Sequence, residues 1–174
     1  MRPLMPLAAS LRTLAALAAV LSALLGAAPA QALCVGVCSC GVTTANIVFG
    51  NINPLNPSNA DATGSVTVSC SGVAGLLIPV TVDLSKGGGA SFASRSMSGG
   101  SGRLQYNLYA DSAHTQVFGD GTASTVDGNA SILLNALGQG PAANFNVYGR
   151  VFGSQTAAVP GAYSDTLAVT LTYY

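Results

Sequence analysis

Residues 167–173 read Leu-Ala-Val-Thr-Leu-Thr-Tyr and contain the clearest structural signal in the chain. Large apolar residues alternate with small or polar ones, which places Leu167, Val169, Leu171 and Tyr173 on one side of an extended backbone. Successive side chains of a strand point to opposite faces of its sheet, so this period of two residues is typical of a strand with one buried face. We therefore expect a half-buried β-strand near the C-terminus.

The same alternation recurs upstream, and no segment after Cys40 shows a helical stripe of useful length. The alternating segments are residues 65–70, 78–84, 104–109 and 145–151. Glycine- and proline-rich turns separate them, at residues 53–57, 86–89, 98–102, 119–121, 127–129, 138–141 and 160–161. Short strands separated by turns, without intervening helices, predict an all-β, immunoglobulin-like sandwich. Residues 122–140 are the least regular part, and residues 132–134 fit either a short strand or a buried loop.

The N-terminal residues have the three regions of a secretion signal. Arg2 and Arg12 precede an apolar run over residues 14–25, and the small-residue stretch 26–32 follows. The apolar run is near a dozen residues, whereas a membrane-spanning helix needs about 20. Cleavage after Ala30 or Ala32 fits the A-x-A pattern. We prefer Ala32, which predicts a signal peptide at 1–32 and a single exported domain at 33–174 that does not insert into the membrane.

All four cysteines, Cys34, Cys38, Cys40 and Cys70, fall in the exported part. An even number of cysteines in an exported chain predicts two disulfides, although the residues alone allow three pairings. A zinc site is the competing interpretation. It is disfavoured because no histidine is near the cysteines and the compartment is oxidising.

The composition offers little for catalysis, metal binding or nucleic-acid binding. The single histidine, His114, lies in the hydrophilic run Asp111-Ser-Ala-His-Thr115, and we interpret this run as a solvated turn rather than a catalytic triad. The chain contains no glutamate, the residue that closes a standard calcium loop. The few cations are scattered, so no nucleic-acid-binding surface is predicted. We expect no enzyme activity, no cofactor and no metal site.

Seven motifs, in one order along nearly the whole exported chain, carry a resemblance to a known family. They are Cys40 followed by Phe49-Gly50 and Pro54, Val66-Thr-Val-Ser-Cys70, Arg95-Ser-Met97, Leu104-Gln-Tyr-Asn-Leu-Tyr-Ala-Asp111, Phe118-Gly-Asp-Gly121, Tyr148-Gly-Arg150, and the segment from Pro160 to Tyr173. The chain resembles the spore coat protein U domain family, which includes subunits of archaic chaperone-usher pili in Gram-negative bacteria. Phe118, where the family frequently has tryptophan, and the extra cysteines Cys34 and Cys38 depart from the simplest pattern.

The resemblance implies a sandwich that lacks one strand and is completed by donor-strand complementation. A periplasmic chaperone supplies the missing strand first, and a neighbouring pilus subunit supplies it after assembly at the outer-membrane usher. Leu167, Val169, Leu171 and Tyr173 are then candidates for strand exchange. The resemblance also implies a disulfide between Cys40 and Cys70, which leaves Cys34 to pair with Cys38.

The short N-terminus bears on the direction of exchange. Only residues 33–39 precede Cys40, whereas a donor strand needs roughly eight to ten free residues. We therefore expect the chain to accept a strand more readily than it donates one.

The expected function is a structural or adhesive pilus subunit, exported through the periplasm to the cell surface and serving attachment and biofilm formation. Two alternatives remain at this point. One is a secreted coat or matrix protein of the same fold outside a fibre. The other is a carbohydrate-binding module that uses exposed aromatic residues.

Overall fold

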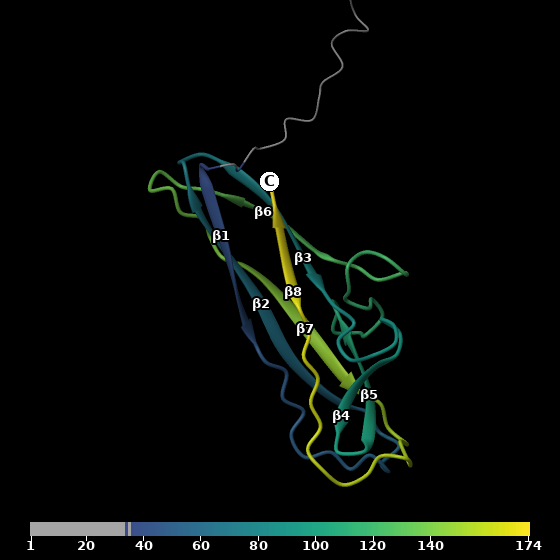
Figure 1. Ribbon diagram of the computed structural model, residues 1–174. Helices are drawn as coiled ribbons and strands as arrows, with labels where there is room; N and C mark the ends of the chain where they lie inside the picture. The colour runs from purple at the N-terminus through teal and green to yellow at the C-terminus, as the bar shows by residue number, and fades with distance from the viewer. Residues whose placement is uncertain (1–33, 35) are drawn as a thin grey trace, which may run out of the picture. The chain divides into compact units, whose positions relative to one another are not determined.

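The computed structural model describes Cys34 and residues 36–174. The elements in this part of the chain are all strands: β1 (Cys38–Ala45), β2 (Ala60–Gly72), β3 (Leu77–Leu84), β4 (Arg95–Gly99), β5 (Gly102–Tyr109), β6 (Gly128–Leu133), β7 (Ala143–Val151) and β8 (Val169–Tyr173). They form a five-stranded sheet with the order β1-β2-β7-β5-β4 and a three-stranded sheet with the order β6-β3-β8, and every pairing is antiparallel (Figure 1).

The strand order is that of an immunoglobulin-like sandwich with one place empty. In such a sandwich, strands A, B, E and D share one sheet, and strands C, F and G share the other. Here β1, β2, β7 and β5 take the order A-B-E-D, while β3 and β8 take the places of C and F. Among the described residues, no strand occupies the place of G on the free edge of β8. The predicted fold class, an all-β immunoglobulin-like sandwich, is confirmed.

The core lies between the inner faces of the two sheets. The residues predicted to alternate inward in β2 and β3 are buried, and Val68, Ile78 and Val82 have no exposed surface. Phe118, Ile132 and Leu134 fill the space between strands. Val66, Leu104 and Val151 extend the same cluster along β2, β5 and β7. This core fixes the two sheets against each other and leaves their edges free to form a site.

Three strands were not expected from the alternation. β4 is short, and β1 is rich in polar or small residues; both exist because they pair with β5 and β2 respectively. The uncertain segment 132–134 forms the end of β6 and continues into a loop, with Ile132 and Leu134 buried. The C-terminal strand begins at Val169, so Leu167 lies just before it.

The predicted signal peptide, residues 1–32, falls outside the described residues and stays a prediction, as do the domain bounds 33–174. No helix long and apolar enough to cross a membrane occurs in the described part of the chain.

Candidate functional site

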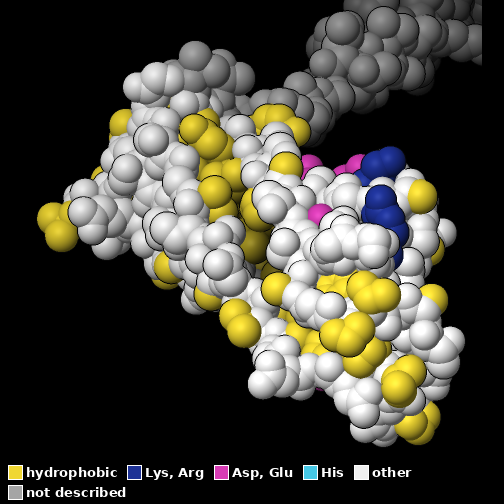
Figure 2. All heavy atoms as spheres, turned by 60° about the horizontal axis from the view of Figure 1, so that its bottom comes forward, with side chains coloured by type: hydrophobic (Ala, Val, Ile, Leu, Met, Phe, Trp, Pro, Cys, Tyr) yellow, Lys and Arg dark blue, Asp and Glu magenta, His cyan; other side chains and the backbone are white. Residues whose placement is uncertain are grey.

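A groove of about 930 Å³ opens between the two sheets, beside the empty strand place. Its walls come from two segments that are far apart in the sequence: residues 44–54, from the end of β1 onward, and residues 159–169, up to the start of β8. Figure 2 shows hydrophobic side chains along a hollow in this part of the molecule. The groove floor is built from inward-facing side chains of both sheets, namely Val66, Leu84, Met97, Leu104, Tyr106, Leu108 and Val147.

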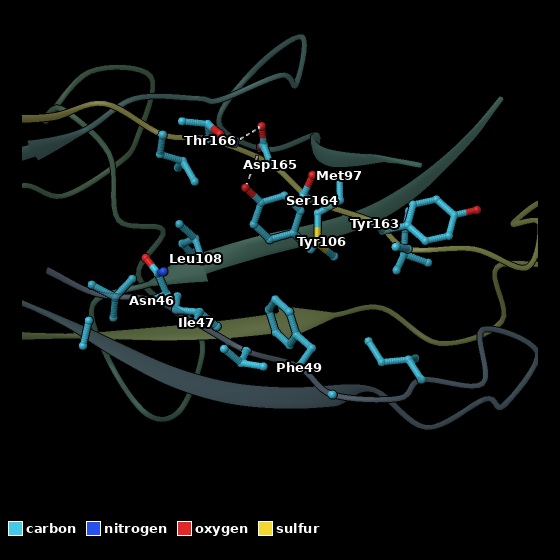
Figure 3. A pocket seen from close by; sticks show the side chains of 18 of the residues that line it. Asn46, Ile47, Phe49, Met97, Tyr106, Leu108, Tyr163, Ser164, Asp165 and Thr166 are labelled. Atoms are coloured by element: carbon cyan, nitrogen blue, oxygen red, sulfur yellow. Dashed lines mark hydrogen bonds between the residues drawn. The ribbon is translucent and has the colours of Figure 1, made fainter. Parts of the chain in front are cut away.

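The first wall, which we call the crossing segment, is residues 46–52. It continues from the end of β1 and lies over two glycines on the inner face of the larger sheet. A Cβ on Gly64 would lie 2.6 Å from Ile47 Cγ1, and a Cβ on Gly149 would lie 2.7 Å from Phe49 Cζ. Phe49 points toward Tyr106 on the groove floor, with ring centroids 6.4 Å apart and the rings edge to face (Figure 3). Side-chain packing therefore holds this wall.

The backbone of the crossing segment is left without partners. No hydrogen bond joins residues 46–52 to any other residue within the part of the chain that the structure describes. Most of these residues are exposed, so water is available to their N–H and C=O groups. A row of extended backbone groups beside an apolar groove is a template for strand pairing.

The second wall, which we call the strap, is residues 159–167. Ser164 and Ser98 exchange two backbone hydrogen bonds of 2.9 and 3.0 Å. Asp165 accepts a hydrogen bond from the Tyr106 hydroxyl at 2.7 Å (Figure 3). It also accepts one from the Gly88 backbone N–H at 2.9 Å. Burial raises the pKa of Tyr106, and the hydrogen bond to Asp165 raises it further, so this phenol stays a donor. The strap is therefore held by polar bonds, unlike the crossing segment.

The four candidates for strand exchange lie on the inward face of the C-terminal segment but are only half-buried. Leu167 and Val169 line the groove. Leu171 and Tyr173 pack against the core cluster and sit opposite Val82 and Val80 of β3. The most regular apolar face of the sequence therefore lacks full cover.

Both edge strands beside the groove are paired on one side only in the described structure. β1 pairs with β2, and β8 pairs with β3. β1 and β8 run in opposite directions (Figure 1). The site thus combines an apolar floor with unpaired backbone on each side, an arrangement suited to an extended peptide.

The cysteines lie at the opposite end of β1 from the crossing segment. Cys40 and Cys70 are directly paired residues of β1 and β2 and form a disulfide. Cys34 and Cys38 form a second disulfide across four positions, and Cys34 is buried. These are the pairs that the family resemblance implies. Cys38 already belongs to β1, so the first strand begins before Cys40.

Asp111 and His114 of the hydrophilic run have different partners. The carboxylate of Asp111 accepts hydrogen bonds from Thr115 and Gln116 and so closes its own turn. His114 lies edge-on to Tyr109, with its Nε2 3.9 Å from an oxygen of Asp61. Among the described residues, no group of three or more His, Cys, Asp or Glu side chains gathers to hold a metal ion.

The aromatic residues do not form one exposed surface. Tyr106, Tyr109 and Phe118 are buried. The hydroxyl of Tyr163 bonds the backbone of Val159. Tyr174 is exposed, at the end of the chain. This distribution does not provide the open aromatic surface that a carbohydrate-binding module needs.

Comparisons with known proteins identify a family and a similar solved structure. The model of the Spore Coat Protein U domain family matches residues 27–170. No curated protein matches the chain in sequence. A solved structure that matches is the CsuC–CsuE chaperone–tip adhesion subunit pre-assembly complex from the archaic chaperone-usher Csu pili of Acinetobacter baumannii. The match has 21% identity and a TM-score of 0.48, and it covers 78% of this chain and 39% of that chain.

Proposed function

The chain belongs to the Spore Coat Protein U domain family, and from this premise we propose that it is an exported structural subunit of an archaic chaperone-usher pilus, completed by a β-strand from a partner. The observation that carries the proposal is the open apolar groove flanked by the unpaired backbone of the crossing segment and of β8. The role is structural, and no residue is assigned to catalysis.

The groove suits a strand better than a compact ligand. An added strand gains main-chain hydrogen bonds from an exposed sheet edge, and its alternate side chains enter pockets on one face. The floor offers inward side chains from both sheets, and the crossing segment offers unpaired backbone groups. An inserted strand would also cover the half-buried face of Leu167, Val169 and Leu171. The apolar cover missing from the isolated chain would thus be supplied by a partner.

The partners that follow are a periplasmic chaperone, the outer-membrane usher and other pilus subunits. The chaperone would fill the groove before assembly, and a neighbouring subunit would fill the same groove after it. We propose export through the periplasm to the cell surface, with the assembled fibre serving attachment and biofilm formation.

We propose that this chain accepts a strand and does not readily donate one. Residues 34–38 are closed into a disulfide loop, and the Val37 carbonyl accepts a hydrogen bond from the Val73 N–H at 3.1 Å. Cys38 then continues into β1 opposite Gly72. With the predicted cleavage after Ala32, little chain would precede β1 to extend into a neighbour, which suits a distal or capping position.

The experiment is co-expression of the full chain with its cognate periplasmic chaperone, followed by isolation of the exported protein. A stoichiometric complex is expected, with aggregation of the chain when the chaperone is omitted. Leu167→Asp should abolish the complex because it places a charge in the groove. Leu133→Asp is the matched control, since Leu133 is exposed on β6, outside the groove. A stable monomer with no affinity for the chaperone would overturn the proposal.

A further inference from the structure

We propose that Asp165 is the positioning residue of the groove: its carboxylate latches the strap in place and so keeps the groove open before a strand arrives. This inference rests on the proposed function, because it assigns a task to one residue in strand acceptance. Asp165 joins three parts of the molecule. One oxygen accepts the Tyr106 hydroxyl of β5, the other accepts the Gly88 N–H of the loop after β3, and Asp165 itself belongs to the strap.

The glycine-rich loop at residues 86–89 is shaped around this carboxylate. Gly87 has a φ of +62°, a conformation that side chains disfavour, and a Cβ there would collide with the Asp165 carboxylate. A Cβ on Gly88 would lie 3.3 Å from an Asp165 oxygen. Only a backbone without side chains allows this loop to approach the carboxylate so closely. The run of glycines that the sequence presents as a turn therefore also provides the cradle for Asp165.

The rest of the strap is seated on the end of the β4–β5 hairpin. A Cβ on Gly99 would lie 2.8 Å from the Tyr163 ring, so the ring rests directly on that strand end. The two backbone bonds between Ser98 and Ser164 fix the position beside it. Asp165 is the next residue along, which makes it the last polar anchor before the apolar Leu167.

The latch matters because the groove floor is apolar. The strap is also bonded at Ser164, to Ser98, and Ala168 just beyond it is bonded to Ser85, so Asp165 holds the stretch between these two anchors. An apolar floor beside an unheld stretch favours collapse, since closing the groove removes that surface from water. If the strap moved away, the buried hydroxyl of Tyr106 would also lose Asp165, its hydrogen-bond acceptor. With Asp165 in place the strap is held at the rim and the floor stays accessible. A pre-formed groove lowers the ordering cost of strand entry, so the latch should act on the association rate.

The test compares Asp165→Asn and Tyr106→Phe with Asp111→Asn in the exported chain. Asp111 is the matched control, because its carboxylate also accepts backbone N–H bonds within a turn but lies away from the groove. Hydrogen exchange should become at least about tenfold faster at the Gly88 and Ser164 amides in Asp165→Asn, with a smaller change in Tyr106→Phe, which keeps the Gly88 bond. Asp111→Asn should leave both amides unchanged.

The second readout is binding of a fluorescein-labelled peptide with the sequence of residues 166–173, followed by fluorescence anisotropy. We expect association to slow about tenfold in Asp165→Asn, whereas Asp111→Asn should bind as the wild type does. Unchanged exchange at Gly88 and Ser164 overturns the latch. Faster exchange with an unchanged association rate overturns its role in strand entry. If the wild type takes up neither this peptide nor the chaperone strand, the proposed acceptor function fails, and the role assigned to Asp165 fails with it.

Discussion

Arg95 takes a positive charge into the interior, where its side chain has no exposed surface. Its guanidinium donates to Asn107 Oδ1 at 3.0 Å and to the backbone carbonyls of Ser85 and Phe118 at 2.9 and 2.8 Å. These bonds tie β4 to β5 and to two loops. Burial lowers the pKa of Arg95. The residue was visible in the sequence only as part of a family motif, because its partners lie 10 to 23 positions away.

Replacing Arg95 with methionine should destabilise the protein strongly. The substitution keeps an apolar stem but leaves the carbonyls of Ser85 and Phe118 without this donor, while Asn107 Oδ1 keeps the bond from the Leu108 N–H. Each unsatisfied group costs about 1–3 kcal/mol, so we expect a loss of at least about 2 kcal/mol in the free energy of unfolding, measured by urea titration. Arg103→Met is the control, because Arg103 is exposed and bonds one side chain, Ser96. A loss at Arg95 no larger than at Arg103 would contradict this account of the core.

The ion pair of Asp61 with Arg150 should make the free energy of unfolding depend on pH. The Asp61 carboxylate accepts two hydrogen bonds of 2.7 Å from Arg150, which is the main reason that its pKa is lowered. A folded-state pKa below the unfolded value of about 3.9 stabilises the fold above that value, and the contribution is lost as the pH falls through the folded pKa. Asp61→Asn should cost less than about 1 kcal/mol near neutral pH, since the pair is exposed. The difference from wild type should vanish in urea titrations at about pH 2, and a difference that persists there would rule out this origin.

At the scale of elements, the crossing segment depends on glycine. Gly64→Ala places a Cβ 2.6 Å from both the Ala45 carbonyl oxygen and Ile47 Cγ1, so the segment has to move. We expect a destabilisation of about 1–3 kcal/mol, the usual range for overpacking. Gly41→Ala in β1 meets nothing within 4 Å and is the matched control. Equal stability of the two variants in thermal unfolding would show that the segment is not seated on Gly64.

The alternation of apolar and polar residues predicts strands well where the opposite sheet covers the apolar face, and less well elsewhere. β2 and β3 follow the expected inward pattern because the opposite sheet covers them. β8 has the clearest alternation but is half-buried, since a period of two identifies the apolar face and not what covers it. β1 carries little apolar signal and is a strand because β2 and a disulfide hold it. The groove walls were not predictable from local pattern, because tertiary packing brings residues 46–52 and 159–167 together.

At the scale of the whole molecule, the two disulfides should differ in how much they stabilise the fold. The Cys40–Cys70 link spans 30 positions and the Cys34–Cys38 link spans 4. In the chain-entropy model, these spans correspond to about 3–4 kcal/mol and about 2 kcal/mol. The double variant Cys40→Ser with Cys70→Ser should therefore lower the urea midpoint more than Cys34→Ser with Cys38→Ser. The reverse order would contradict this ranking.

The missing strand is the property of the whole molecule from which the proposed function follows. Within the described residues, six of the seven immunoglobulin-type places are filled, with a well-packed core at one side and an open groove at the other. The sequence resemblance implied such a gap. The structure adds its position, its apolar floor and the difference between a wall held by side chains and a wall held by Asp165.

Backbone hydrogen exchange in the purified chaperone complex tests this claim most directly, in comparison with the chain alone kept dilute. A partner strand in the groove should protect the amides of the crossing segment and of the β8 edge, while exchange in β2 and β3 stays as it was. Equal exchange of the crossing segment in both samples, or protection that falls only on the outer surface of the larger sheet, would contradict a strand in the groove.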